Sequence, residues 1–305
     1  MRKNRGYEET QLSQKTPSAE RLRTLPRGGF IVDTPAGQIQ VGAPPETIKD
    51  TIVTEASVPQ IFVLPCTMFN WRKGINVADM EFPIYFNFFL RGQKVRIVGT
   101  EEQGERLEVA IRQAVFGPES FDLRMDTFDA GDDIYVPDIR KELGYFRGSL
   151  SLDKMYEFIP FSNGKAEVEG VTIERSRRDG YQLSWKGQKP IAVPACVEYV
   201  PTFDIGNKPT KRFDPPRFGV TCLGPSHGFD PADNTSGFII WLNRNGVMVD
   251  PPVNSTEWLL ESNVNPKLID SIILTHCHAD HDAGTFFFFN DTGTTEIYTT
   301  KTIMN

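Results

Sequence analysis

The chain has 305 residues, of which 39% are apolar, and its formal net charge of −7 gives a pI near 5.3. This length and apolar content suit one large folded domain or two ordinary ones. The negative charge supplies no basic field for a polynucleotide, which disfavours nucleic acid as a partner. No apolar run approaches the roughly 18 residues of a membrane span, so no membrane partner is expected. The cysteines show no CxxC pair, which is typical of reduced thiols in a cytoplasmic protein; they are Cys66, Cys196, Cys222 and Cys277.

The first 29 residues are basic and rich in Pro, Ser and Gln, which predicts a flexible tail. The alternative, an organelle-targeting segment, conflicts with its acidic residues. Residues 30–211 are predicted to form a mixed α/β domain of unknown role. "GGFIVDTPAGQIQVG" is typical of a hairpin that turns at Pro35 to Gly37. "EEQGERLEVAIRQAVFG" has apolar residues at helical spacing, acidic residues in its first turn, and Gly117 at the expected helix stop.

From Lys165 onward the pattern changes to strands. "KAEVEGVTIE" and "YQLSWKG" are joined by "RSRRDG", and "KPIAVPACVEYV" adds another strand. The proline-rich stretch "PTFDIGNKPTKRFDPPRFG" is typical of a connector and places a domain boundary near residue 212. No repeat period is visible along the chain.

Residues 212–305 are predicted to form the second domain. "RFGVTCLG" is a strand, and "GFIIWLNRNGVMVDPP" is two strands around a turn at Asn245-Gly246. "STEWLLESN" predicts a short helix with Ser255 as its cap, and "LIDSIILTH" predicts a buried strand.

This last strand runs into "THCHADHDAG", which holds three of the four histidines of the chain within six residues. Alternating side chains of an extended segment point the same way, so His276 and His278 can face one ion. Asp280 and His281 follow in the turn and can face a second ion. Imidazole and carboxylate are ligands that Zn, Mn or Fe accept, and water on such an ion loses its proton near neutral pH. A structural role suits a lone histidine better than this cluster.

The sequence "ILTHCHADHDAG" resembles the HxHxDH signature of the metallo-β-lactamase superfamily, and "GVMVDPP" resembles the Asp-ended strand that precedes the signature. The resemblance implies two divalent metal ions, Zn first and Mn or Fe as alternatives. It makes His276 and His278 ligands of the first ion, and Asp280 and His281 ligands of the second, with Asp280 as the catalytic residue. It also implies that Asp250 binds neither ion but orients the loop that carries the ligands.

The stretch "GVTCLGPSHGFDPADNTSGFIIW" resembles the branch that holds ribonuclease Z and metal-dependent cyclic-nucleotide phosphodiesterases. In particular, it is similar to microbial proteins in which a lactamase-type domain accompanies cyclic-nucleotide-binding domains. The resemblance covers residues 217–305 and leaves residues 30–200 without a match. His227, in a loop of this region, fits either a place at the rim of the site or an ordinary hydrogen bond.

The function that this resemblance implies is metal-dependent hydrolysis of a small phosphodiester, a cyclic nucleotide, by a metal-activated hydroxide. Two alternatives stay open. The first is a thioester or lactam hydrolase, which would use the same ions to polarise a carbonyl. The second is a non-catalytic regulatory or nucleotide-binding module.

The expected fold class is α+β, a mixed α/β domain followed by the first half of a metallo-β-lactamase αββα sandwich. The superfamily completes its site with a further His, a bridging Asp and a last His, whereas this chain has no His after His281. We therefore expect an incomplete domain, a fragment that is itself inactive, with strand edges and an apolar face left uncovered. Such surfaces also suit a homo-oligomer. "FFFFNDTGTTEIYT" resembles the translation of a sequencing adapter, whereas "YTTKTIMN" is typical of a further strand and helix start. No functional residue is therefore assigned beyond Thr285.

Overall fold

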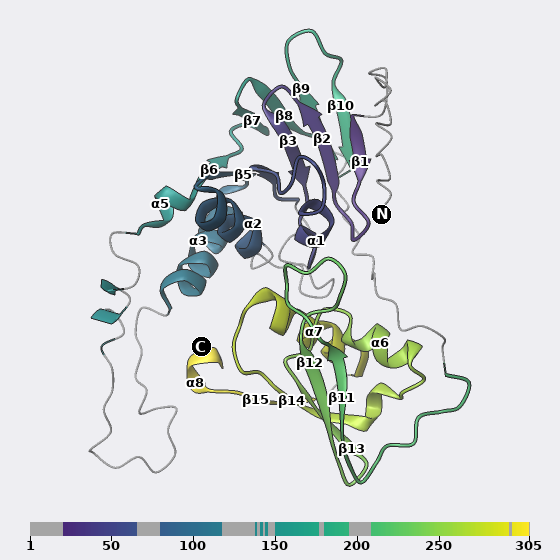
Figure 1. The fold of residues 1–305 in the computed structure, drawn as a ribbon. Helices are drawn as coiled ribbons and strands as arrows, with labels where there is room; N and C mark the ends of the chain where they lie inside the picture. The colour runs from purple at the N-terminus through teal and green to yellow at the C-terminus, as the bar shows by residue number, and fades with distance from the viewer. Residues whose placement is uncertain are drawn as a thin grey trace, which may run out of the picture.

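The computed structural model describes residues 21–65, 80–117, 138, 141–142, 144–145, 150–176, 180–194, 209–292 and 295–304, with only the backbone for 286–292. The described strands form three sheets of six, four and five strands, and helices pack on them (Figure 1). This confirms the expected α+β class. The first two sheets form what we call the first unit, residues 21–194, and the third sheet lies in the second unit, residues 209–304. Among the described residues, no helix has both the length and the apolar composition of a membrane span.

The six-stranded sheet contains the expected hairpin, whose turn residues are Pro35 and Ala36. The sheet also reaches into the segment expected to be a flexible tail, because a strand that starts at Leu22 pairs with the first hairpin strand. Residues 1–20 of that tail and two of the cysteines, Cys66 and Cys196, lie outside the described residues. The strands are β1 (Leu22–Thr24), β2 (Phe30–Thr34), β3 (Gly37–Val41), β4 (Ile61–Val63), β5 (Val95–Gly99) and β6 (Tyr156–Pro160).

The helices of the first unit cover one face of this sheet. The predicted helix over residues 101–116 is confirmed, because Thr100 and Gln103 form a capping box and Gly117 ends the helix with φ 74°. Its buried side, with Leu107, Ile111 and Val115, belongs to the core below the strands. The helices are α1 (Ile48–Thr51), α2 (Glu81–Tyr85) with its π-helical continuation η3 (Phe86–Leu90), α3 (Glu101–Phe116) and α5 (Leu152–Met155).

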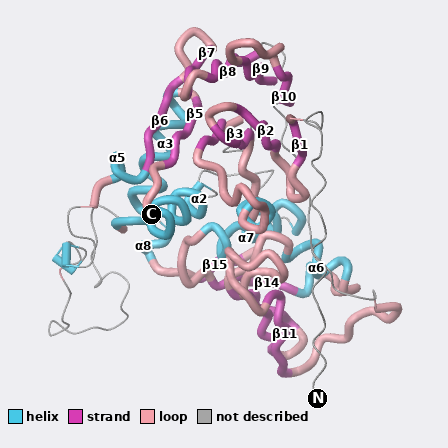
Figure 2. The backbone as a smooth tube through the Cα atoms, turned by 45° about the horizontal axis from the view of Figure 1, so that its top comes forward, coloured by secondary structure: helices cyan, strands magenta, loops and turns pink. Residues whose placement is uncertain are grey.

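A four-stranded antiparallel sheet covers the other face of the first sheet (Figure 2). The stretch "KAEVEGVTIE" is two strands rather than one, because Glu169 and Gly170 both take positive φ and reverse the chain. The strands are β7 (Lys165–Val168), β8 (Val171–Ser176), β9 (Gly180–Ser184) and β10 (Ile191–Pro194).

The third sheet has the order β11-β12-β13-β14-β15. Its hairpin turns at Asn243 and Arg244, both at positive φ, and not at Asn245-Gly246 as the sequence suggested. Gly246 serves packing instead, because a Cβ there would lie 2.4 Å from Cδ1 of Ile269. The strands are β11 (Phe218–Gly224), β12 (Gly237–Leu242), β13 (Asn245–Val249), β14 (Ile269–Ile273) and β15 (Glu296–Tyr298).

The predicted short helix of the second unit is present, but Ser255 is its first residue and not its cap. Asn254 holds the cap position, and the Ser255 hydroxyl donates a hydrogen bond to the Pro252 carbonyl. The helices are α6 (Ser255–Glu261), the 3-10 turn η5 (Pro266–Leu268), α7 (Ala279–Thr292) and α8 (Lys301–Met304).

The first five strands of the first sheet and the five strands of the third sheet have the same topology, a repeat that the sequence pattern did not reveal. In β1–β5 and in β11–β15, the first three strands are antiparallel and the next two are added in parallel. The register also agrees, because Phe30 pairs with Val41 as Phe238 pairs with Val249. A helix follows the third, fourth and fifth strands in both cases, namely α1, α2 and α3 in the first unit and α6, α7 and α8 in the second.

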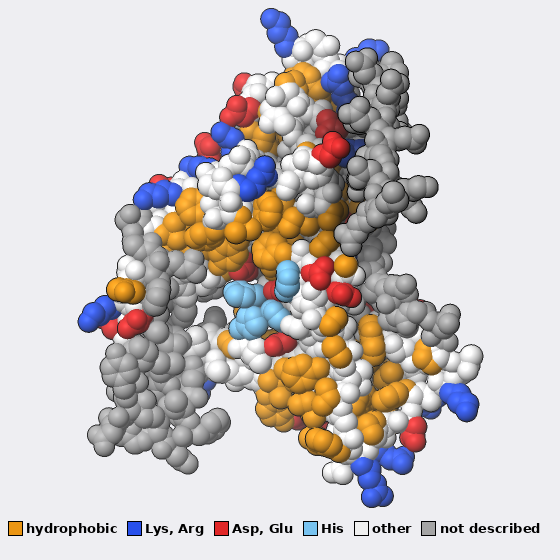
Figure 3. All heavy atoms as spheres, viewed as in Figure 1, with side chains coloured by type: hydrophobic (Ala, Val, Ile, Leu, Met, Phe, Trp, Pro, Cys, Tyr) orange, Lys and Arg blue, Asp and Glu red, His pale blue; other side chains and the backbone are white. Residues whose placement is uncertain are grey.

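The two copies differ in what covers the sheet. In the first unit, Val32 and Ile39 are buried under the four-stranded sheet. In the second unit, the same face is exposed to solvent. Phe218 is 76% exposed, Val220 65% and Leu242 48%. Figure 3 shows hydrophobic side chains over this part of the molecule.

Replacing Gly246 with Ala should lower the free energy of unfolding by about 1–3 kcal/mol, because the added methyl group meets Ile269 in a filled core. Urea unfolding would measure the change. Asn245→Ala is the control, since Asn245 is exposed and follows the turn. We expect it to stay within about 0.5 kcal/mol of the wild type. A larger loss in Asn245→Ala than in Gly246→Ala would contradict the observed turn.

Candidate metal centre

The histidine cluster lies where β14 passes into α7. His276 and His278 occupy the connecting segment, whereas Asp280 and His281 lie in the first turn of α7 and not in the loop turn expected from the sequence. The His276 ring centroid is 4.8 Å from that of His278 and 4.4 Å from that of His281. Histidine side chains gather on the visible surface between the two units, next to acidic groups (Figure 3).

Asp250 holds the beginning of this segment. It follows β13 at a φ of 46°, and its backbone N–H donates to the Ile273 carbonyl at 3.0 Å. Its two carboxylate oxygens accept hydrogen bonds from the Thr275 backbone N–H at 2.8 Å and from the Thr275 hydroxyl at 2.5 Å. That hydroxyl also lies 2.8 Å from His276 Nδ1. Asp250 is therefore connected to His276 through Thr275, which leaves Nε2 of His276 for other partners.

Asp280 is held by the loop that follows β11. Its Oδ2 accepts a hydrogen bond from the Gly228 backbone N–H at 3.1 Å and lies 3.5 Å from His281 Nε2. Gly228 is needed for this close approach, because a Cβ there would lie 2.8 Å from both Asp280 Oδ2 and the Phe82 ring. His227, the neighbouring histidine, accepts a hydrogen bond from the Phe229 N–H through Nδ1, which matches the ordinary hydrogen bond left open for it.

Two acidic residues that the sequence reasoning missed lie in the same region. Glu81 comes from α2 of the first unit, is 3% exposed, and places Oε1 3.6 Å from His278 Nε2. Asp282 lies one residue beyond the signature, and its Oδ1 is buried without a hydrogen-bond partner. The sequence "NVADMEFP" contains no ligand spacing that relates Glu81 to the histidines. Asp282 lies within "THCHADHDAG", so the sequence alone offers it as a further acidic residue of the site.

Burial and like charge shift the pKa values in this region. Burial, followed by the charges of Asp280 and Asp282, raises the pKa of Glu81 to about 8. Burial and the Asp280 charge raise the pKa of Asp282 to about 7. The pKa of His276 is lowered by burial and then by the neighbouring His281 and His278 rings, which favours the neutral imidazole that binds metals.

The donor atoms of the cluster are of the types that bind divalent ions, although the side chains are not yet arranged around a single position. Within the described ranges, no group of three or more His, Cys, Asp or Glu side chains is already arranged to hold an ion. Three imidazoles nevertheless meet beside a buried carboxylate, and His281 Nδ1 is buried without a partner. Imidazole and carboxylate are the ligands that zinc and similar ions accept.

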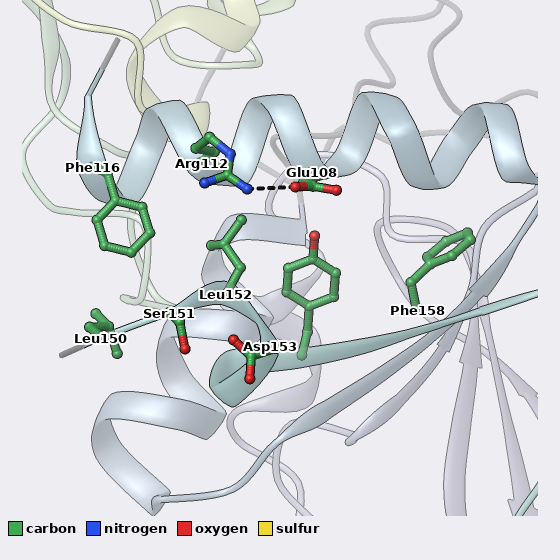
Figure 4. Close-up of a pocket in the computed structure, with 9 residues that line it drawn as sticks. Glu108, Arg112, Phe116, Leu150, Ser151, Leu152, Asp153 and Phe158 are labelled. Atoms are coloured by element: carbon green, nitrogen blue, oxygen red, sulfur yellow. Dashed lines mark hydrogen bonds and ion pairs between the residues drawn. The ribbon is translucent and has the colours of Figure 1, made fainter. Parts of the chain in front are cut away.

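A hollow of about 600 Å³ lies elsewhere, between α3 and the start of β6 (Figure 4). The Glu108–Arg112 ion pair, 2.5 Å long, lies beside it, and Tyr156 and Phe158 form part of its wall. None of the cluster residues lines this hollow, so the candidate centre is identified by its chemistry and not by cavity size.

Residues 230–304 match the family model described as Metallo-beta-lactamase superfamily. This range contains Asp250 and every residue of the histidine cluster, so the resemblance found in the sequence is confirmed.

Two curated relatives from Dictyostelium discoideum match most of the chain. The cGMP-dependent 3',5'-cGMP phosphodiesterase A is 28% identical over 92% of this chain and 47% of its own length. The cAMP/cGMP-dependent 3',5'-cAMP/cGMP phosphodiesterase B is 29% identical over 90% of this chain and 31% of its own length. The chain thus spans less than half of each relative. The matches also extend over the first unit, for which the sequence reasoning found no relative.

Solved structures show a weaker likeness. The match to a diphosphatase from the PhnP family covers 90% of this chain and 73% of the diphosphatase, with 10% identity and a TM-score of 0.27. The match to the metallo-beta-lactamase fold protein YhfI from Bacillus subtilis covers 89% of this chain and 77% of YhfI, with 11% identity and a TM-score of 0.25.

Thr275→Val should weaken the binding of a divalent ion by about 10–100-fold, because it removes the hydroxyl that connects Asp250 to His276. Titration with Zn²⁺ in competition with a chelator would measure the change. Thr285→Val is the matched control, since the Thr285 hydroxyl is buried without a hydrogen-bond partner. Equal affinities of the two variants would contradict a role for this connection.

The metal-free protein should lose stability as the pH rises. Both acidic groups have raised pKa values in the folded protein, so each contributes fully to the free energy of unfolding only below its unfolded pKa. The contribution of Glu81 is complete below 4.5 and is lost as the pH rises through about 8. That of Asp282 is complete below 3.8 and is lost as the pH rises through about 7. One pH unit in this window corresponds to about 1.4 kcal/mol per group.

Urea unfolding of Glu81→Gln would test this expectation. The metal-free variant should be more stable than the wild type near pH 9 and similar to it near pH 4. Glu102→Gln is the control, because the Glu102 side chain is 73% exposed on α3. A stability difference of Glu81→Gln that does not change with pH would contradict the raised pKa.

Proposed function

We propose that the whole protein to which this chain corresponds is a metal-dependent hydrolase that cleaves phosphodiester bonds in cyclic nucleotides. The observation that carries the proposal is the meeting of His276, His278 and His281 beside the buried Asp280. The superfamily match over this segment supports a hydrolase that uses divalent metal ions. The names of both curated relatives support a cyclic-nucleotide substrate.

In this proposal, His276 and His278 hold one divalent ion, and Asp280 and His281 hold a second. Zinc is the preferred identity, and Mn or Fe are the alternatives. When bound, such ions lower the pKa of a coordinated water and stabilise charge on phosphoryl oxygens. The chain's own groups prepare the site. Asp250 positions His276 through Thr275, and the Gly228 N–H orients the Asp280 carboxylate.

The charge of the chain supports a small substrate. A net charge of −7 opposes the approach of a long polyanion, whereas a cyclic nucleotide carries a single phosphodiester charge. The described cysteines, Cys222 and Cys277, are free thiols, which supports a cytoplasmic location. The proposal includes the domain boundary near residue 212, because the strands β11 to β15 pair only with one another among the described strands.

Asp280→Asn should lower kcat for cAMP and cGMP by at least about 100-fold, which corresponds to roughly 2.7 kcal/mol of lost transition-state stabilisation. The assay follows product nucleotide released by the purified whole protein loaded with Zn²⁺ or Mn²⁺. Thr285→Val, whose hydroxyl has no hydrogen-bond partner, is again the control.

Parallel assays separate the alternative functions. Hydrolysis of a thioester or a β-lactam, with phosphodiesters left intact, would replace the proposed reaction by acyl transfer. Binding of cyclic nucleotide by a metal-loaded protein that hydrolyses none of these substrates would indicate a regulatory module. Either result would overturn the proposal.

A further inference from the structure

The first unit packs directly against the loop between β11 and β12, the loop whose Gly228 N–H donates to Asp280 of the histidine cluster. Buried Lys49 bonds to the Asp233 carbonyl at 2.9 Å, and the Thr235 hydroxyl donates to Glu46 Oε1 at 3.0 Å. The Phe82 and Phe229 rings meet edge to face at 5.0 Å. These contacts are apolar or buried and hydrogen-bonded, so they define the position of α2 relative to the cluster.

Glu81 lies where the two copies of the repeat meet. It is the first residue of α2, and Ala279 is the first residue of α7, the helix in the same place of the second copy. Ala279 belongs to the apolar core of the first unit, and its backbone N–H is a hydrogen-bond partner of the Glu81 carboxylate. The start of a helix is a favourable place for a negative charge, so α7 helps to hold this carboxylate.

The Glu81 carboxylate faces the cluster and is incompletely satisfied. Its Oε1 lies 3.6 Å from His278 Nε2, and its Oε2 is buried without a hydrogen-bond partner. Burying a carboxylate with one oxygen unpaired is costly, and such groups are rare away from functional sites. His278 itself is half-exposed on its other side.

We propose that Glu81 is a positioning residue of the metal centre, supplied by the first unit. Its carboxylate orients the His278 ring through Nε2, which keeps the proton on that nitrogen and leaves Nδ1 free for a metal ion. Histidine ligands commonly donate their second N–H to a carboxylate, and the loss of that partner weakens metal binding. The inference depends on the proposed function only in that the cluster binds a divalent ion.

Co²⁺ is the probe, because its visible absorption reports ligand geometry and its titration gives an affinity. Glu81→Gln keeps the size of the side chain and removes its ability to ionise. We expect it to weaken Co²⁺ binding by about 10–100-fold and to shift the visible band of the bound ion. Glu81→Asp, which restores the carboxyl group on a shorter side chain, should recover part of the affinity.

Glu46→Gln is the matched control. Glu46 is also a buried carboxylate of the first unit and also contacts the second unit, but its contacts are Lys49 and Thr235 and not the histidines. Its Co²⁺ affinity and spectrum should match those of the wild type, even where thermal unfolding shows a lower Tm. A purely structural role of Glu81 would make the two variants behave alike.

The outcomes distinguish this inference from the proposed function. Unchanged Co²⁺ affinity and spectrum in Glu81→Gln would overturn the inference, as would a wild-type protein that binds no Co²⁺. Weakened binding in Glu81→Gln, together with a wild type that leaves every phosphodiester intact, would support the inference and overturn the proposed function. If Glu81→Gln does not fold, the Co²⁺ affinity of Glu81→Asp decides, and a value equal to the wild type overturns the inference.

Discussion

The hydrogen bonds between Asp250 and Thr275 are the constraint on which the candidate site depends. They join the end of β13 to the segment after β14, at the point where the strands stop and the ligand-type side chains begin. Parallel pairing brings these two strand ends to the same edge of the sheet. The side chains that follow therefore emerge in one place, and α7 then carries Asp280 and His281 to the same place.

The first unit shows what the same backbone does without those side chains. Gly42 stands where the second copy has Asp250, and both residues take positive φ and donate to the carbonyl of the next parallel strand. The turn is therefore preserved while the carboxylate is absent. The order and direction of the strands agree between the copies, so the main differences lie in their side chains, in local register shifts of the second copy and in what covers their sheets.

Local features of the sequence predicted much of this molecule. The β2–β3 hairpin, α3 with its Gly117 stop, and the strand before the histidines depend on periodicity and caps that are visible within a short window. The turn near Gly246 was placed wrongly because Asn-Gly is a strong turn signal, whereas here Gly246 makes room for Ile269. Glu81 could not have been found, because it reaches His278 only through the packing of two units. The repeat was hidden because the two copies share backbone geometry and few side chains.

The contact between Glu81 and His278 also connects two events that the chain could otherwise keep separate. If ion binding favours the arrangement in which α2 meets α7, then the ion must stabilise the docking of the first unit by the same free energy that docking adds to ion binding. A molecule that binds the first unit and changes this contact would thereby alter metal occupancy without touching a ligand. The contact between the two copies would then act as a thermodynamic coupling between the copy without the histidine cluster and the copy that carries it.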